Sequence, residues 1–347
     1  MTTLIPSPGP GFVPAAGTAN LHLSPGGGVA TRARSAIRAH AQIAARFGRT
    51  GVAPFIAAPE VEVIDLVDGY GAAGYARRRR WAVTPGDVVA PDAMSETALS
   101  QYLAELKARR LRPAFMAISD PEPYLRRGFA LEEIADEAVI DLPTFSLAGS
   151  ARANLRHATT SARRAGLTVM PYAPWQDRQL AEISREWLST KRGGELGFTL
   201  SRHDDVAEQL ADGATDLWCA VDGTGQLQAW CTWRHYRGGQ ARVIDVMRRR
   251  PHAPNPAMDF LLATTLEHYR DSGVLFASLA SVPRDHGSAA ERVYPTRSLR
   301  SYKQKFAPRW EPRWLAVPHA WQRPLAMLAI CGAYCPGGVR RAILRNG

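Results

Sequence analysis

Residues 241–281, ARVIDVMRRRPHAPNPAMDFLLATTLEHYRDSGVLFASLAS, decide the fold class of this chain. Two apolar runs of strand length, 241–247 and 274–281, flank a Pro-rich loop and a stretch of helical length. Apolar side chains recur in that stretch every three or four residues and so share one face of a helix. They are Met258, Leu262, Leu266 and Tyr269. Strand, helix and strand in this order predict an α/β protein with a mixed sheet.

Around this unit the chain makes two similar passes of strands and helices. The first pass has predicted strands at 61–67, 77–84, 113–118 and 132–142, a Gly-rich turn before the second of them, and helices at 95–110 and 122–128. The second pass adds helices at 151–166 and 178–192 and a hairpin of strands 215–221 and 226–236. Ser95 is the expected N-cap of its helix, and Gly166 the expected stop of helix 151–166. We therefore expect duplicated domains that meet near residue 150.

The charge of the chain indicates its class of partner. The 347 residues carry 43 Lys and Arg against 32 Asp and Glu, a formal net charge of +11. This excess predicts a polyanion: nucleic acid, an anionic membrane surface or phosphates. The apolar run at 324–335 is shorter than the ~20 residues of a spanning helix, so we expect no transmembrane segment. The four cysteines lack the paired spacing of a zinc site, so we expect no metal and free thiols in a reducing cytoplasm.

Seven motifs occur in an order that resembles one known family. They are TPGDVVAP (84–91), DEAVIDLPTFSLAG (136–149), NLRHATTSARRAG (154–166), ELGFTL (195–200), IDVMRRRP (244–251), AMDFL (257–261) and SLRSYKQKFAPRWEPRWLAVP (298–318). Together they resemble the catalytic domain of the bacterial phosphatidylglycerol aminoacyltransferases, the multiple-peptide-resistance or lysyl-phosphatidylglycerol synthase family. The resemblance implies two tandem acetyltransferase-like (GNAT) domains with mixed central sheets. It also implies a charged tRNA as the donor.

The resemblance divides the chain into four expected parts. Residues 1–45 are a disordered or loosely helical tail, 46–150 an N-terminal GNAT-like domain, 151–318 the catalytic GNAT-like domain, and 319–347 an amphipathic basic tail. Coenzyme A is disfavoured as donor, because the loop 248–257 has three prolines and no glycine with which to cradle a pyrophosphate. No cofactor is expected.

Two departures from the family pattern bear on the acceptor. No multi-span flippase region precedes the domain in these residues, and the stretch YPTRSLR (294–300) differs from the family. The chain is thus similar to free-standing relatives such as the seryl-tRNA-dependent transferase of valanimycin biosynthesis. We expect transfer of an amino acid, with serine the preferred choice, to a small amine or hydroxylamine in natural-product (antibiotic) biosynthesis. The alternatives are a phosphatidylglycerol aminoacyltransferase that contacts an anionic membrane through 319–345, and a non-catalytic tRNA-binding protein.

The candidate catalytic residues follow from the chemistry of an activated ester, which needs positioning, proton removal and an oxyanion partner. Asp245 ends an apolar strand and Arg248 follows it, so we expect both at the ester unless they merely close the strand. Glu137 is expected to bind the donor's amino group or to be an edge-strand charge. Asp259 lies at the start of the predicted helix, where a carboxylate interacts favourably with the helix dipole. Capping of the helix is its expected role, and substrate binding is secondary. His235, His252 and His286 are candidate bases by residue type alone.

The basic and aromatic stretch 301–306 is expected to be extended, with Lys303 and Lys305 on one face and Tyr302 among the alternating aromatics. Lys305 is the expected catalytic cation, and Tyr302 and Lys303 are expected to bind substrate. A set of arginines is expected to bind tRNA phosphates, although each one alone is typical of a solvated surface. The set is Arg152, Arg156, Arg163, Arg300 and Arg313.

Overall fold

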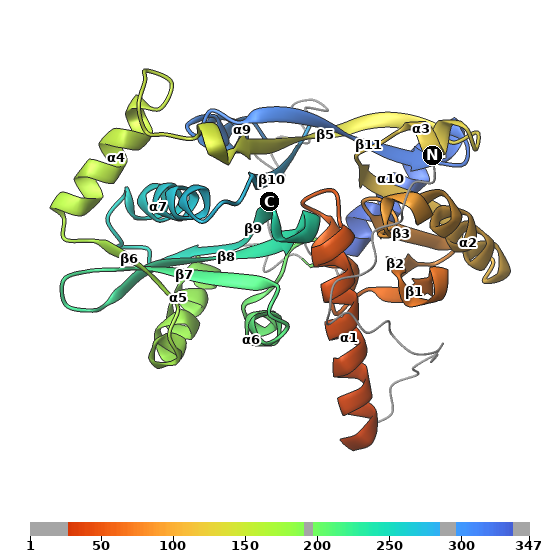
Figure 1. Ribbon diagram of the computed structural model, residues 1–347, viewed down its shortest axis with the longest axis horizontal. Coiled ribbons are helices and arrows are strands. Elements are labelled where there is room, and N and C mark those ends of the chain that lie inside the picture. The colour runs from red at the N-terminus through yellow and green to blue at the C-terminus, as the bar shows by residue number, and fades with distance from the viewer. Residues whose placement is uncertain (1–26, 191–196, 285–295, 336–347) are drawn as a thin grey trace, which may run out of the picture.

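The computed structural model describes residues 27–190, 197–284 and 296–335, without the side chains of 27–34. Eleven strands form one mixed sheet in the order β1-β2-β3-β4-β11-β5-β10-β9-β8-β7-β6 (Figure 1). The strands are β1 Glu62–Leu66, β2 Gly71–Arg78, β3 Trp81–Pro85, β4 Arg112–Ile118, β5 Ala130–Asp141, β6 Thr168–Pro171, β7 Thr215–Val221, β8 Leu227–Tyr236, β9 Ala241–Arg249, β10 Phe276–Pro283 and β11 Arg309–Val317. The helices are α1 Gly27–Phe47, α2 Ser95–Ala108, α3 Glu122–Leu125, α4 Ala153–Arg164, α5 Asp177–Ser189, α6 Val206–Ala211, α7 Ala257–Asp271, α9 Thr296–Gln304 and α10 Arg323–Tyr334.

The two passes predicted from the sequence are two like halves of this sheet. Each half contains one parallel pair, β3 with β4 and β9 with β10, and the remaining pairs are antiparallel. The second strand of each parallel pair contains an alanine with positive φ, +65° at Ala117 and +62° at Ala280. The predicted α/β class, with a mixed sheet made of two like halves, is confirmed.

The halves are joined more closely than two separate sheets would be. Strand β11 pairs with β4 on one side and with β5 on the other, so the last strand of the chain closes the junction. Strand β5 in turn pairs with β10 of the second half. Residues on either side of position 150 therefore share one continuous sheet. The division into domains at that position remains a proposal about the sequence repeat.

Helices cover both faces of the second half. Helices α4 and α7 lie on one face of the sheet, and α5 and α6 lie on the other (Figure 1). Leu261, Leu262 and Leu266 of α7 pack with Leu155 of α4 in one buried cluster. Because α7 lies against the sheet along its length, its N-terminal turn is held beside the end of β9.

Three local expectations were wrong. The Gly-rich segment that was expected to form a turn is strand β2. Glycine is needed there because the backbone at Ile56 packs closely against it: a Cβ at Gly74 would lie 2.6 Å from the Ile56 carbonyl oxygen. Ser95 Oγ donates to the Pro91 carbonyl and caps no amide of α2. Residues 301–304 of the stretch expected to be extended belong to helix α9. Gly166, with φ of +77°, does follow the end of α4 as expected.

Both expected tails contain packed structure. Helix α1 buries Ile43 and Ala44, and His40 lies 2.7 Å from Asp65, so residues 40–44 belong to the fold. Helix α10 packs Ala329 and Ile330 into a buried cluster of the first half. Residues 1–26 and 336–347 lie outside the described residues.

No helix in the described ranges is long and apolar enough to cross a bilayer.

Candidate active site

The second half opens its sheet between the two parallel strands. Strands β9 and β10 pair only from Ala241 to Val243 on one strand and from Phe276 to Ser278 on the other. In the first half, the segment after β3 remains tied to β4. There the Asp87 carboxylate accepts hydrogen bonds from Ser119 N at 2.9 Å and from Ser119 Oγ at 2.7 Å. The opening is therefore in the second half, beyond Val243.

A bulge at this opening determines where the β9 side chains point. Cys231 pairs with Met247 and Trp233 with Ile244, so three steps on β9 match two on β8. Ile244 and Met247 consequently both contact the α7 side of the sheet. The same three-residue offset places Asp245 and Arg248 together on the α5 and α6 side.

Asp245 is a buried carboxylate that is only half satisfied. Its Oδ1 accepts a hydrogen bond from Ser201 N at 3.1 Å, while Oδ2 has no hydrogen-bond partner among the described residues. Burial raises the pKa of Asp245, and the nearby charge of Arg234 opposes that rise. A buried oxygen without a partner is costly, and such groups concentrate at functional sites.

Arg248 is 7% exposed and lies over the Trp187 ring, with its guanidinium carbon 3.8 Å from the ring centroid. Its Nη1 donates to the Met247 carbonyl at 3.0 Å. The sequence did not single out Trp187, because Leu180, Ile183 and Trp187 follow the spacing of a core-facing helix stripe. Only the fold shows that this tryptophan reaches the end of β9.

Trp187 also lines a hollow of about 330 Å³ that contains three of the predicted residues, Asp259, Tyr302 and Lys305. Lys305 Nζ lies 3.0 Å from Asp259 Oδ2 and 4.9 Å from the centre of the Tyr302 ring. Burial, followed by the neighbouring Asp259 carboxylate, raises the pKa of Tyr302 well above its usual value. The hollow thus combines a carboxylate, an ammonium, a phenol and an aromatic wall. The structure thus brings Asp259, Tyr302 and Lys305 together, although Lys305 was expected on an extended strand, and Asp245 and Arg248 do not line this hollow.

Lys303 is buried, contrary to the exposed position expected for it. It is 6% exposed, and its Nζ donates to the Ala280 and Ser281 carbonyl oxygens at 3.0 and 3.1 Å. Burial lowers its pKa to about 7, and the Glu137 charge opposes this shift. The side chain is fixed at the bulge of β10, beside the opening of the sheet.

Replacing Lys303 with Met is expected to stabilise the fold, most strongly at low pH. Between pH 7 and 10.5 the unfolded chain binds a proton at Lys303 that the folded chain does not, so stability rises with pH across that window. The increase in the free energy of unfolding caused by Lys303→Met is therefore largest below pH 7. There it amounts to about 1–3 kcal/mol, because the loss of two hydrogen bonds offsets part of it. The increase disappears toward pH 10.5.

Urea denaturation at pH 6 and pH 9 measures this gain, with the exposed Lys107→Met as the matched control. An equal effect of Lys303→Met at both pH values would contradict the burial of a lysine with a lowered pKa.

Glu137 and Arg313 form a buried ion pair at the junction of the halves. Arg313 Nη2 lies 2.6 Å from Glu137 Oε2, and Ser278 Oγ donates to Glu137 Oε1 at 2.5 Å. Gly51 N donates to the same Oε1 at 3.2 Å. The expectation that Arg313 extends an exposed basic track is wrong, because Arg313 is 3% exposed. Glu137 is 1% exposed with both oxygens engaged, so it holds strands together rather than lining the hollow.

Three other predicted tRNA-binding arginines lie on or beside α4. Arg163 is exposed and its guanidinium lies 5.8 Å from the centre of the Phe260 ring of α7. Arg156 donates to the Leu147 and Gly149 carbonyl oxygens. Arg152 donates to the Phe306 carbonyl at 3.2 Å, one residue from Lys305, and burial lowers its pKa.

Arg300 is separated from this group of arginines. Its Nη1 is 2.8 Å from Asp136 Oδ2, and its guanidinium lies over the Trp310 ring.

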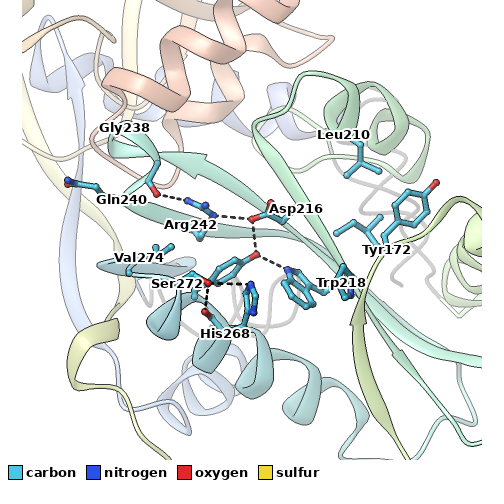
Figure 2. A pocket seen from close by; sticks show the side chains of 15 residues that line it. Tyr172, Leu210, Asp216, Trp218, Gly238, Gln240, Arg242, His268, Ser272 and Val274 are labelled. Atoms are coloured by element: carbon cyan, nitrogen blue, oxygen red, sulfur yellow. Dashed lines mark hydrogen bonds and ion pairs between the residues drawn. The ribbon is translucent and has the colours of Figure 1, made fainter. Parts of the chain in front are cut away.

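A second and larger hollow, of about 580 Å³, lies at the opposite end of α7 (Figure 2). Asp216 lies there between Arg242 and Tyr269, at 3.0 Å from each, and Tyr269 OH accepts from Trp218 Nε1. His235 Nε2 is 2.9 Å from the same carboxylate. Hydrogen bonds connect Asp216, Arg242, Tyr269 and Trp218 with one another, and none of the predicted catalytic residues lines this hollow.

Of the two remaining candidate bases the structure describes one, His252, and it lines neither hollow. His252 is exposed, and His286 lies outside the described residues, as do residues 294 and 295 of the divergent stretch. Within the described ranges, no three His, Cys, Asp or Glu side chains gather where they could hold a metal ion.

Comparison with known proteins identifies relatives of this architecture. The family model described as phosphatidylglycerol lysyltransferase, C-terminal, matches residues 43–317. A phosphatidylglycerol lysyltransferase of Bacillus subtilis is 27% identical over 273 residues, covering 72% of this chain and 31% of the relative. An uncharacterised protein of Corynebacterium glutamicum is 25% identical over 295 residues, covering 76% and 36%. This chain spans about a third of the length of these relatives.

Solved structures show the same fold. The C-terminal domain of a putative lysylphosphatidylglycerol synthetase from Agrobacterium fabrum has a TM-score of 0.78 at 23% identity, covering 88% of this chain and 99% of that one. The L-PGS of Bacillus licheniformis has a TM-score of 0.75 at 21% identity, covering 87% and 96%.

Proposed function

Because the chain belongs to the phosphatidylglycerol lysyltransferase C-terminal family, we propose that it transfers an aminoacyl group from charged tRNA to phosphatidylglycerol. The observation that carries the chemistry is the buried Asp245 carboxylate, whose Oδ2 has no hydrogen-bond partner in the described part of the chain. It lies where β9 separates from β10. A proton acceptor held at the opening of the sheet is what ester exchange requires.

The reaction exchanges one ester for another. A headgroup oxygen forms a bond to the acyl carbon, and the bond from that carbon to the ribose oxygen of the tRNA breaks. Asp245 takes the proton of the attacking hydroxyl and returns it to the leaving ribose oxygen. Arg248, on the same face of the sheet, stabilises the negative charge that develops on the carbonyl oxygen.

The hollow at Asp259, Tyr302 and Lys305 fits the aminoacyl end of the donor, and Trp187 connects it to Arg248, whose guanidinium lies over the same ring. Its volume of about 330 Å³ suits an amino acid rather than a nucleotide chain. The Asp259 carboxylate can bind an α-ammonium if Lys305 moves, and Lys305 is 37% exposed and therefore has room to move. The aromatic wall at Trp187 covers the apolar part of the donor.

The basic surface of α4 fits the phosphates of the tRNA. Helix α4 packs along α7, and the first turn of α7 contains Asp259. A tRNA whose phosphates bind α4 therefore has its aminoacylated end directed toward the hollow. We expect Arg163→Glu with Arg164→Glu to weaken tRNA binding at least tenfold at low salt and to flatten its salt dependence, because fewer counterions are released.

Filter binding across a salt series measures this effect. Lys107→Glu on the distant helix α2, combined with Arg110→Glu just after that helix, is the matched charge control. An unchanged salt slope in the α4 variant would remove this helix from the tRNA site.

The acceptor expected from the sequence was a small amine or hydroxylamine, with serine as the amino acid. The relatives that carry an activity name are phosphatidylglycerol lysyltransferases, which favours the lipid acceptor. Nothing in these relatives supports serine or natural-product biosynthesis.

The proposal is tested by incubating the full chain with a mixed pool of charged tRNAs and phosphatidylglycerol vesicles, followed by mass spectrometry of the extracted lipid. We expect an aminoacylated phosphatidylglycerol whose mass identifies the amino acid. Binding of tRNA without any lipid product would support the non-catalytic alternative, and a product only on an added amine would support the small acceptor.

A further inference from the structure

The C-terminal helix α10 and the short 3-10 turn before it, Ala320–Gln322, present apolar side chains to solvent. Three large side chains occur four and three residues apart, and they are far more exposed than a packed helix would leave them. They are Trp321 at 66%, Leu325 at 47% and Leu328 at 65% exposure. The opposite side of the helix is anchored, because Ala326, Ala329 and Ile330 pack into the core of the first half. Ile330 therefore does not belong to the exposed face.

A basic hairpin lies against the end of this helix. Arg78, the last residue of β2, donates from Nε to the Gly332 carbonyl at 2.8 Å, which ties the β2–β3 turn to α10. The neighbouring Arg77, Arg79 and Arg80 are exposed, and no described carboxylate forms an ion pair with them. The apolar stripe thus runs toward a cluster of three uncompensated cations.

This surface is connected to the active site by a short path. Tyr334 OH of α10 hydrogen-bonds Thr199 Oγ1 at 2.6 Å, and Gly197 N donates to the Tyr334 carbonyl at 3.1 Å. Two residues beyond Thr199, Ser201 N donates to Asp245. A surface that binds α10 is therefore next to the segment that positions the catalytic carboxylate.

We propose that Trp321, Leu325 and Leu328, together with Arg77, Arg79 and Arg80, form a docking surface for an anionic lipid bilayer. Apolar side chains enter the boundary of the acyl chains while arginines meet the headgroup phosphates. RNA is disfavoured as the occupant, because exposed leucines gain nothing from a phosphate backbone. This inference rests on the proposed function, since the acceptor is a lipid of such a bilayer.

The test uses two double variants, Leu325→Glu with Leu328→Glu, and Arg79→Glu with Arg80→Glu. Leu125→Glu, at a position 51% exposed on α3, is the apolar control, and Lys107→Glu with Arg110→Glu is the charge control. Sedimentation with vesicles of phosphatidylglycerol and phosphatidylcholine gives the partition coefficient. We expect it to fall about 100-fold in the leucine variant and about 10-fold or more in the arginine variant, and to be unchanged in both controls.

Transfer to a short-chain, monomeric phosphatidylglycerol distinguishes docking from catalysis. Both double variants are expected to retain wild-type transfer to the monomeric lipid and to lose transfer to vesicles. Vesicle binding by the variants equal to wild type would overturn the docking surface, and a fall in tRNA affinity instead would assign the arginines to RNA. If wild type binds vesicles through this surface but never transfers to the monomeric lipid, the proposed function fails and the docking surface stands.

Discussion

Replacing Arg313 with Met is expected to lower the free energy of unfolding by about 3–5 kcal/mol, because it leaves a buried carboxylate without its partner. Glu137 is 1% exposed and accepts from Arg313 Nε at 2.7 Å, while Glu311 holds the other side of the guanidinium at 2.8 Å. These groups lie on β5 and β11, where the two halves of the sheet join. Loss of the pair is thus expected to weaken the whole molecule rather than one half.

A double variant separates the value of the pair from the penalty of breaking it. Glu137→Met with Arg313→Met removes both charges, so it is expected to recover most of the stability that Arg313→Met loses. Urea denaturation monitored by tryptophan fluorescence measures all three proteins. If Arg313→Met lowers the free energy of unfolding by less than about 1 kcal/mol, the ion pair does not stabilise the junction of the two halves as proposed.

Substitutions of Asp245 and Arg248 are expected to slow the transfer reaction. Asp245→Asn keeps the volume of the side chain and removes its capacity to take a proton, so we expect kcat to fall by about 10²–10⁴-fold. Arg248→Lys is expected to be damaging as well, because it loses the planar fork. Since both residues serve one transition state, the double variant is expected to be little worse than the poorer single one.

The control for Asp245→Asn is Asp204→Asn, a carboxylate three residues after Ser201 whose side chain is 97% exposed. Single-turnover transfer and tRNA affinity are measured in parallel. We expect unchanged tRNA affinity in every variant and unchanged transfer in the control. Near-wild-type transfer by Asp245→Asn would return Asp245 to a structural role.

Periodicity predicted the elements that carry the site better than it predicted the site itself. The apolar stripe of α7 and the runs of β9 and β10 depend on neighbours a few residues away, so the sequence shows them directly. The stretch 301–306 was misread because alternating cations and aromatics imitate a strand. Tyr302 and Phe306 are in fact four apart on one face of a helical segment, with their ring centroids 5.9 Å apart.

Contacts between distant residues were beyond reach of any such pattern. Glu137 and Arg313 are 176 positions apart, and each looks like an ordinary surface charge in its own strand. Asp245 and Arg248 were paired on sequence grounds, but a regular strand would place residues three apart on opposite faces. Only the bulge opposite Cys231 and Trp233 brings them to one face.

Single-turnover transfer with a labelled donor follows the amino acid from tRNA to phosphatidylglycerol. Excess enzyme is mixed with tRNA charged with a radiolabelled amino acid, chosen from the lipid mass, in the presence of phosphatidylglycerol vesicles. The label is then partitioned between tRNA, water and organic solvent. We predict that it moves from tRNA into the lipid phase in a single exponential, and that Asp245→Asn slows this step without changing tRNA affinity. Label that remains on tRNA, or that appears only in water, would contradict the account.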